Sequence, residues 1–194
     1  MTDYIELLLP NNNNIVNYCT KIINSFSYEE KYNSKHQFRW ICSKLTDDNI
    51  FSDLTIIDPN ILCIVQHVAL IMNHHGYNVL SCPQEDDIVV EIYCKTAQNK
   101  YISSEFDIHQ DNDGVLYCKE HAFICYLENS CDGCELAIYS DDDESLLIKL
   151  LETKSHDDFF KKIIILNGNT YHKPMPIKDG NRICIVFHIK QSLC

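Results

Sequence analysis

The pattern of apolar and polar positions changes partway along the chain. Up to about residue 76 the apolar residues recur at helical spacing, most clearly in DPNILCIVQHVALIMNHHG, where Asp58 can cap a helix, Pro59 suits its first turn and Gly76 can end it. The apolar face of this helix consists of Ile61, Val65, Val68 and Met72. The sequence therefore predicts that residues 1–76 are mainly helical and that this helix packs on a sheet.

From Tyr77 onward, the period changes to two, and short apolar runs are separated by polar turns. The expected strands are residues 77–81, 87–95, 101–109, 121–128, 134–140, 145–152, 161–168 and 182–190. Eight short strands with almost no helix between them are typical of a sandwich, barrel or jelly roll. We therefore expect an α+β fold that is mainly β, a single domain over residues 1–194 in which residues 1–76 support a β core at residues 77–194.

Composition and charge narrow the classes of partner. Hydrophobic residues make up 45% and charged residues 23% of the 194 residues, which is typical of a globular chain. The formal net charge of -12 disfavours binding to a phosphate backbone, which depends largely on Lys and Arg. The acidic start and the brief apolar run broken by Pro10 are unlike a signal peptide, and no later apolar run approaches the ~18 residues of a membrane span. We expect no nucleic-acid partner, no membrane partner and a cytoplasmic location.

The chain has 11 cysteines, which lie mostly inside apolar runs, as at Cys63, Cys125 and Cys184. A reduced thiol in such a run behaves as a small core residue, so we expect reduced thiols in an intracellular compartment. Cys131 and Cys134 form a C-x-x-C pair, a spacing that also occurs in zinc sites and redox motifs. Because no second ligand pair at matching spacing accompanies it and it lies between two expected strands, we interpret it as a turn.

Candidate chemistry centres on the stretch FDIHQDNDG, in which His109 and Asp111 are two residues apart. In a strand these side chains point to the same face, so an imidazole and a carboxylate can reach one pocket. With a third ligand, the pair would form the two-histidine, one-carboxylate triad that holds Fe(II) and leaves coordination positions open. The spacing alone is not decisive, because His156 and Asp158 repeat it in a polar turn.

The downstream stretch LNGNTYHKPMPIKDGNRICIVFHI supplies further candidates. His172 follows an expected strand and a turn, and Arg182 lies at the start of the next apolar strand. An arginine that enters a barrel interior is costly unless it meets an anion, and its planar fork suits a dicarboxylate. The pair at His156 and Asp158 lies too close to His172 to leave room for the intervening strands, so the earlier pair is favoured.

Four segments in order, FDIHQD, FICYLEN, DGCELAIY and IIILNGNTYHKPMPIKDGNRICIVFH, resemble the Fe(II)- and 2-oxoglutarate-dependent dioxygenases, specifically the prolyl-4-hydroxylase-like branch. The resemblance runs from about Val89 to Ile189. It implies a double-stranded β-helix, or distorted jelly roll, buttressed by N-terminal helices. This fold agrees with the alternation of apolar and polar residues described above.

The resemblance also assigns roles to individual residues. The iron ligands would be His109, Asp111 and His172. Arg182 would bind the distal carboxylate of 2-oxoglutarate, Tyr126 would assist through its hydroxyl, and Leu136 would form an apolar wall of the cosubstrate pocket.

Two positions depart from the family pattern. Cys134 follows Gly133 where the family commonly has two glycines, and Val186 stands where a hydroxylated residue often supports the cosubstrate. Both changes would affect the affinity for the cosubstrate more than the resemblance to the family. The remaining histidines that we consider are interpreted as structural: His67, His74, His75, His121 and His188.

The activity that the resemblance implies is hydroxylation of an unactivated C–H bond, with a prolyl residue of a protein or peptide as the favoured substrate. Fe(II), 2-oxoglutarate and dioxygen would be required, ascorbate is a candidate reductant, and the loop at residues 95–105 would gate the substrate groove. Two alternatives remain: an inactive protein of this fold that acts as a binding module or decoy, and a zinc-thiolate or other structural protein. The Asn-, Ile- and Lys-rich composition suits a large DNA virus or another AT-rich genome; a viral product would act in a host cell. The sequence leaves the oligomeric state open.

Overall fold

A computed structural model describes residues 3–24, 38–41, 59–83, 87–96, 107–111, 120–133, 135–154 and 158–192. In this part of the chain the fold is mainly β, with two α-helices and two antiparallel sheets. The major sheet has six strands in the order β1-β7-β4-β9-β3-β2. Its strands are β1 (Tyr4–Pro10), β7 (Phe160–Asn167), β4 (Glu120–Asn129), β9 (Asn181–Lys190), β3 (Ile88–Thr96) and β2 (Phe38–Ile41).

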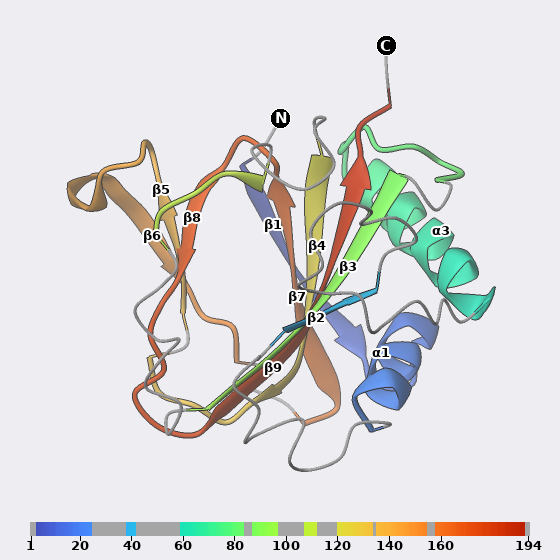
Figure 1. Cartoon of the computed structure of the whole chain (residues 1–194), viewed down its shortest axis with the longest axis horizontal. Helices are drawn as coiled ribbons and strands as arrows, with labels where there is room; N and C mark the ends of the chain where they lie inside the picture. Colours follow the sequence, from blue (N-terminus) through green and yellow to red (C-terminus); the bar gives the residue numbers. More distant parts are fainter. Residues whose placement is uncertain are drawn as a thin grey trace.

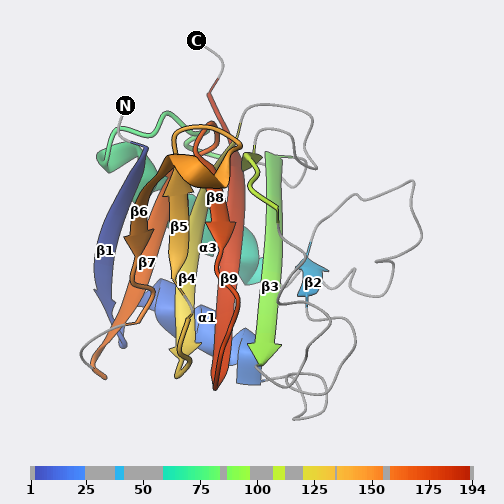
Figure 2. The same cartoon turned by 90° about the vertical axis from the view of Figure 1, so that its left-hand side faces the viewer.

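The minor sheet has three strands in the order β6-β5-β8 and faces one side of the major sheet (Figure 1). Its strands are β6 (Leu147–Leu151), β5 (Leu136–Tyr139) and β8 (Tyr171–Pro174). Figure 2 looks onto this sheet, which lies in front of the longer strands of the major sheet. The helices α1 (Asn14–Asn24) and α3 (Pro59–His74) cover the opposite face of the major sheet. The major sheet is therefore covered on both faces.

Because strand residues alternate between faces, the central strands supply two separate cores. On the helix side, the core of β9 is apolar and consists of Ile183, Ile185, Phe187 and Ile189. On the side of the minor sheet, Cys184 and Val186 of β9 pack with Tyr126 of β4 and Leu136 of β5. This double burial explains why β4, β7 and β9 read as nearly continuous apolar runs. The polar residues that interrupt the inner face are therefore candidates for a site.

Helix α1 begins at Asn14, the last residue of the Asn-rich run at residues 11–14. The backbone N–H of Ile15 donates to Asn13 Oδ1 at 2.9 Å, and the N–H of Asn17 donates to the Asn13 carbonyl at 2.9 Å. Asn13 is therefore the N-cap of α1, a position at which asparagine is among the preferred residues.

Helix α3 confirms the predicted end and packing. Its Val65, Val68 and Met72 are fully buried against the major sheet, together with Tyr77. Gly76 has a φ of +86°, and the N–H of Tyr77 donates to the Met72 carbonyl at 3.0 Å. A glycine in the left-handed conformation closes the helix, as expected. Asp58, the predicted cap, lies outside the described residues.

The expectation that residues 1–76 are mainly helical is wrong in part, because β1 and β2 lie within them. β1 pairs along its whole length with β7, which places Ile5, Leu7 and Leu9 against the helix-side core. Glu6, on the other face, forms ion pairs with Lys149 and Lys162. The alternation in this short segment is a strand signal that its leucine run and Pro10 obscured.

The other strand predictions have mixed outcomes. Strands are confirmed within residues 87–95, 121–128, 134–140, 145–152, 161–168 and 182–190. Residues 77–81 form only an isolated bridge, between Val79 and Gln191. Strand β8 was not predicted, because its four residues are too few to show an alternation. Residues 101–106 lie outside the described residues, and the single-domain assignment stays a prediction. None of the helices in the described part has the length and apolar character needed to cross a membrane.

Gly180 provides a test of the turn that leads into β9. Its φ is +78°, and a Cβ atom there would lie against the Ser130 carbonyl oxygen and 2.9 Å from Cys131 Cα. We expect Gly180→Ala to lower the free energy of unfolding by about 3 kcal/mol, because strain and backbone contact add. Gly76→Ala, at a φ of +86° with nothing within 4 Å, should cost only about 1 kcal/mol. Equal losses in denaturant titrations of the two variants would contradict this account.

Candidate metal centre and cosubstrate pocket

His109 and His172 are brought together by backbone pairing. They form an isolated antiparallel bridge in which the N–H of His109 donates to the His172 carbonyl at 3.1 Å and the N–H of His172 donates to the His109 carbonyl at 2.9 Å. This bridge extends the edge of the minor sheet, where β8 carries His172. Residues that are directly opposite on such a bridge present their side chains to the same face. The two imidazoles are therefore neighbours although they are distant in sequence.

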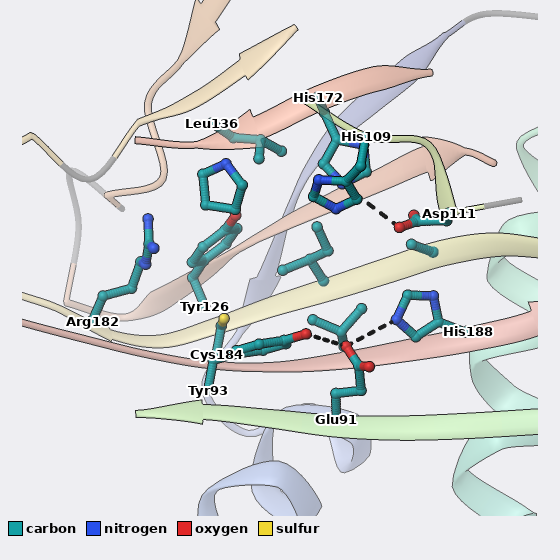
Figure 3. A pocket seen from close by; sticks show the side chains of 14 residues that line it. Glu91, Tyr93, His109, Asp111, Tyr126, Leu136, His172, Arg182, Cys184 and His188 are labelled. Atoms are coloured by element: carbon teal, nitrogen blue, oxygen red, sulfur yellow. Dashed lines mark hydrogen bonds and ion pairs between the residues drawn. The ribbon is translucent and has the colours of Figure 1, made fainter. Parts of the chain in front are cut away.

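Asp111 completes a compact donor set with these histidines. One nitrogen from each imidazole and one oxygen of the carboxylate lie within 4.8 Å of one another. His172 Nε2 lies 3.6 Å from Asp111 Oδ1, and the two imidazole ring centroids are 4.3 Å apart (Figure 3). The structure thus brings together the three residues that the sequence analysis selected as metal ligands; the role itself stays a prediction.

Backbone carbonyls orient both imidazoles. His109 Nδ1 lies 2.9 Å from the Asp107 carbonyl oxygen, and His172 Nδ1 lies 2.9 Å from the Thr170 carbonyl oxygen. A carbonyl oxygen can only accept, so in each neutral imidazole Nδ1 carries the hydrogen and Nε2 keeps its lone pair. This is the tautomer that a metal ligand requires, and such contacts commonly fix histidine ligands.

The charge state of the donor set also fits a divalent cation. Asp111 is 8% exposed, and its Oδ2 is a buried atom with no hydrogen-bond partner among the described residues. Burial raises the pKa of Asp111, but the neighbouring His172 and His188 imidazoles outweigh this effect and the pKa is lowered. Burial lowers the pKa of His172, which favours its neutral form. A buried carboxylate with an orphaned oxygen beside two imidazole nitrogens suits Fe(II) or a similar transition metal.

Arg182 and Tyr126 lie at the far end of the same pocket from Asp111 (Figure 3). Arg182, on β9, is 4% exposed, and its Nη1 lies 3.5 Å from the Met175 carbonyl oxygen. Leu136 of β5 is fully buried and lines the pocket between the two ends. The empty space within the pocket, including its open mouth, is about 540 Å³.

Tyr126 is placed as a hydrogen-bond donor. Burial raises its pKa far above the usual range, the neighbouring Cys184 raises it further, and the positive charge of Arg182 only partly opposes this shift. The phenol therefore keeps its proton at all ordinary pH values. The end of the pocket near Arg182 thus offers a guanidinium, a hydroxyl donor and an apolar wall to an anionic group.

A second polar cluster lines the pocket floor and was missed by the sequence analysis. It consists of Glu91 and Tyr93 on β3 and His188 on β9, with Glu120 of β4 behind His188. His188 was interpreted as a core or rim histidine; it is buried, as expected of such a residue, but it lies in the pocket lining. Glu91 and Tyr93 occupy alternate positions of β3 and point to the same face as the inner residues of β9. This alternation is the sequence signal that could have placed them in the pocket.

The remaining histidines that can be placed lie outside this donor set. His121 is fully buried, stacks edge-to-face with Tyr77 and accepts a hydrogen bond from the Gly168 N–H at 3.2 Å. His67 and His74 are exposed and His75 is partly exposed on or just after α3, away from the pocket. His156 lies outside the described residues, so the alternative H-x-D pair is not placed.

The cysteine prediction is corrected at one position. Cys131 is disulfide-bonded, whereas we expected reduced thiols; its C-x-x-C neighbour Cys134 lies outside the described residues. The free cysteines in the described part are Cys19, Cys63, Cys82, Cys125 and Cys184. Cys131 lies in the segment after β4, where a buried sulfur adjoins Ile177 and the turn of Gly180. The sequence around Cys131 does not indicate whether its sulfur is a free thiol or part of a disulfide.

Solved structures share this fold. IDO from Bacillus thuringiensis is similar over 99% of this chain and 91% of its own, with 12% identity and a TM-score of 0.55. A prolyl 4-hydroxylase from Phytophthora capsici is similar over 96% of this chain, with 10% identity and a TM-score of 0.58, although this chain spans only 59% of its length. The fold is that of the prolyl 4-hydroxylases. The predicted resemblance to this branch is therefore confirmed at the level of the fold.

A viral relative in fold is also known with cosubstrate bound. The collagen prolyl hydroxylase vCPH from Paramecium bursaria Chlorella virus 1, in its 2OG complex, is similar over 99% of this chain and 97% of its own, with 14% identity and a TM-score of 0.50. No protein-family model matches the sequence, and no curated protein matches it significantly. At these identities the likeness concerns the fold, so residue roles rest on the geometry of the site.

The donor set predicts tight binding of a divalent transition metal. In anaerobic calorimetric titration with Fe(II), His172→Ala and Asp111→Ala should each weaken binding by more than about 100-fold, since each removes a ligand. His67→Ala, which changes an exposed helical histidine, is the matched control and should bind as wild type does. Unchanged affinity in the two pocket variants would show that the cluster is not a metal site.

His188 predicts a distinct dependence of stability on pH. Burial lowers its pKa, but the adjacent Glu91 carboxylate more than compensates, and the pKa is raised to about 10. Because this value exceeds the unfolded value of ~6.5, the folded state binds the proton more tightly. The stabilisation is complete below about pH 6.5 and is lost as pH rises towards 10. The melting-temperature difference between wild type and His188→Gln should therefore shrink over this interval.

His121→Gln is the control for this measurement. Burial lowers the pKa of His121 to about 4, so this imidazole stays neutral from pH 6.5 to 10. Its melting-temperature difference from wild type should remain constant across that interval. A parallel change for both variants would mean that His188 is not the titrating group.

Proposed function

We propose that this chain is an Fe(II)- and 2-oxoglutarate-dependent dioxygenase that hydroxylates an unactivated C–H bond. The main observation behind this proposal is a single pocket with a two-histidine, one-carboxylate set at one end and a buried arginine at the other. The fold shared with prolyl 4-hydroxylases supports this proposal. In the same proposal, the major and minor sheets are the two halves of a double-stranded β-helix.

His109, Asp111 and His172 would hold the metal through Nε2, a carboxylate oxygen and Nε2. Bound Fe(II) supplies the activation of dioxygen that side chains cannot provide. All three side chains line the same pocket, which leaves room beside them for cosubstrate and substrate.

Arg182, Tyr126 and Leu136 would bind and orient 2-oxoglutarate. The guanidinium of Arg182 can form a charge-assisted, two-point contact with the distal carboxylate, and the Tyr126 hydroxyl can donate to the same group. Leu136 and Ile124 line the intervening wall and exclude water from the chain of the cosubstrate. Bound in this way, one end of the dicarboxylate would be held by Arg182, and its keto acid end would be directed towards the histidines.

The substrate in this proposal is a protein or peptide, and a prolyl residue is the first to test. The acidic net charge of -12 favours neutral or basic partners through complementary potential. Dioxygen is the second cosubstrate, and ascorbate is a candidate reductant. Action in the cytoplasm, without a nucleic-acid or membrane partner, belongs to the same proposal.

Succinate release tests the activity and the roles of both ends of the pocket. With Fe(II), 2-oxoglutarate and a panel of proline-containing peptides, wild type should release succinate and His172→Ala should not. Arg182→Ala should raise the KM for 2-oxoglutarate by about 100-fold, because it removes one partner of a buried charge pair. Lys154→Ala removes only an exposed lysine paired with Asp132 and should leave both parameters unchanged.

The outcome also distinguishes a catalyst from a binding module. A wild-type chain that binds Fe(II) and 2-oxoglutarate but releases no succinate with any peptide, or without one, would favour the inactive binder. A chain that binds neither Fe(II) nor 2-oxoglutarate would contradict both the dioxygenase and the inactive binder of this fold.

A further inference from the structure

The floor of the pocket carries polar groups that neither metal nor cosubstrate binding explains. β3 and β9 pair in antiparallel register, with Glu91 opposite Val186 and Tyr93 opposite Cys184. Glu91, Tyr93 and His188 therefore project from the same face of the major sheet into the pocket, below the histidines (Figure 3). Glu91 is 6% exposed and His188 is 8% exposed. Burial of charged side chains costs free energy, which favours a functional role for these two residues.

Glu91 is held in place through one of its two oxygens. Oε2 accepts a hydrogen bond from the Tyr93 hydroxyl and lies 3.2 Å from His188 Nε2. Oε1 has no hydrogen-bond partner among the described residues. Burial and the charge of Glu91 raise the pKa of Tyr93 well above its ordinary value, so the phenol remains a donor. The carboxylate is thus fixed by two donors and keeps one acceptor oxygen for another group.

The charges around Glu91 leave a negative excess. In the proposed complex, the dianion of 2-oxoglutarate balances the divalent metal and Arg182 balances Asp111. On the floor, the single imidazole of His188 lies between two carboxylates, 3.2 Å from Glu91 Oε2 and 3.6 Å from Glu120 Oε1. Burial raises the pKa of Glu120 to about 7, so this carboxyl is partly ionised at neutral pH, and one imidazolium cannot fully neutralise it together with Glu91. A cation that reached Oε1 of Glu91 would complete the balance in a place with little water.

We propose that Glu91, positioned by Tyr93 and His188, anchors a cationic nitrogen of the substrate, an ammonium or a guanidinium, beside the reacting carbon. This inference rests on the proposed dioxygenase function and narrows its substrate class. The nitrogen of an internal prolyl residue carries no hydrogen and no charge, so it cannot satisfy Glu91. The anchored group therefore comes either from a basic side chain or from a free amino group.

Two matched pairs of small ligands test whether the pocket prefers a cation and whether that cation is a basic side chain or a free amino group. N-acetylarginine amide against N-acetylcitrulline amide varies only the side-chain charge, and prolinamide against N-acetylprolinamide varies only the amino group. Binding is measured by calorimetry on the full chain loaded with Mn(II) and 2-oxoglutarate in the absence of oxygen. The cationic member of at least one pair should bind about 10- to 100-fold more tightly, as expected for a charge-assisted hydrogen bond.

Variants of the floor should shift this preference in opposite directions. Glu91→Gln should abolish the preference for the cation, whereas His188→Gln should increase it, because the competing imidazolium is removed. Tyr93→Phe, which keeps the ring and both charges, should weaken the preference without abolishing it. If the floor were only a structural ion pair, Glu91→Gln and His188→Gln would both lower the melting temperature and neither would alter the ratio of affinities.

The controls separate this inference from the proposed function. Binding of Mn(II) and 2-oxoglutarate is measured first in every variant; its loss in wild type would defeat the proposed function. If both bind and neither ligand pair shows a preference for the cation, the inference about Glu91 is overturned while the dioxygenase proposal stands. His67→Ala serves as the variant outside the pocket, and its affinity ratio should equal that of wild type.

Discussion

The site depends on one pair of backbone hydrogen bonds, those between His109 and His172. They attach the segment at residues 107–111 to the minor sheet and thereby set the spacing of all three donor side chains. The carbonyls of Asp107 and Thr170 then orient the imidazoles. No side-chain contact in the cluster would hold this geometry alone, because a carboxylate and two neutral imidazoles attract one another only weakly without a cation between them.

The second constraint is the burial of the major sheet on both faces. Its helix side needs continuous apolar packing, so every polar group with a chemical role lies on the face towards the minor sheet. Alternate positions of β9 show this division: Ile183, Ile185 and Phe187 pack under the helices, and Arg182 and His188 enter the pocket. One strand therefore stabilises the fold and supplies Arg182 at one end of the pocket and His188 on its floor.

The sequence predicted most of the core strands, because short apolar runs separated by polar turns are a local signal. The residues of the donor set were selected from the H-x-D spacing together with the resemblance of four segments to a known family. The sequence missed β1, whose apolar run is interrupted by Pro10, and β8, which is too short to show a period. The floor of the pocket was hidden for a different reason. Glu91 and His188 are far apart in sequence and meet only through the register of β3 with β9, which no local pattern specifies.

The orphaned oxygen of Asp111 has a consequence for the lifetime of the protein in a cell. A ligand that binds only the folded form stabilises it by mass action, by about 2.7 kcal/mol at a concentration 100-fold above its Kd. If the chain binds iron and 2-oxoglutarate as proposed, the fraction of chains open to proteases would follow the supply of these two ligands. Scarcity of either ligand would then reduce the abundance of the protein as well as its rate of reaction.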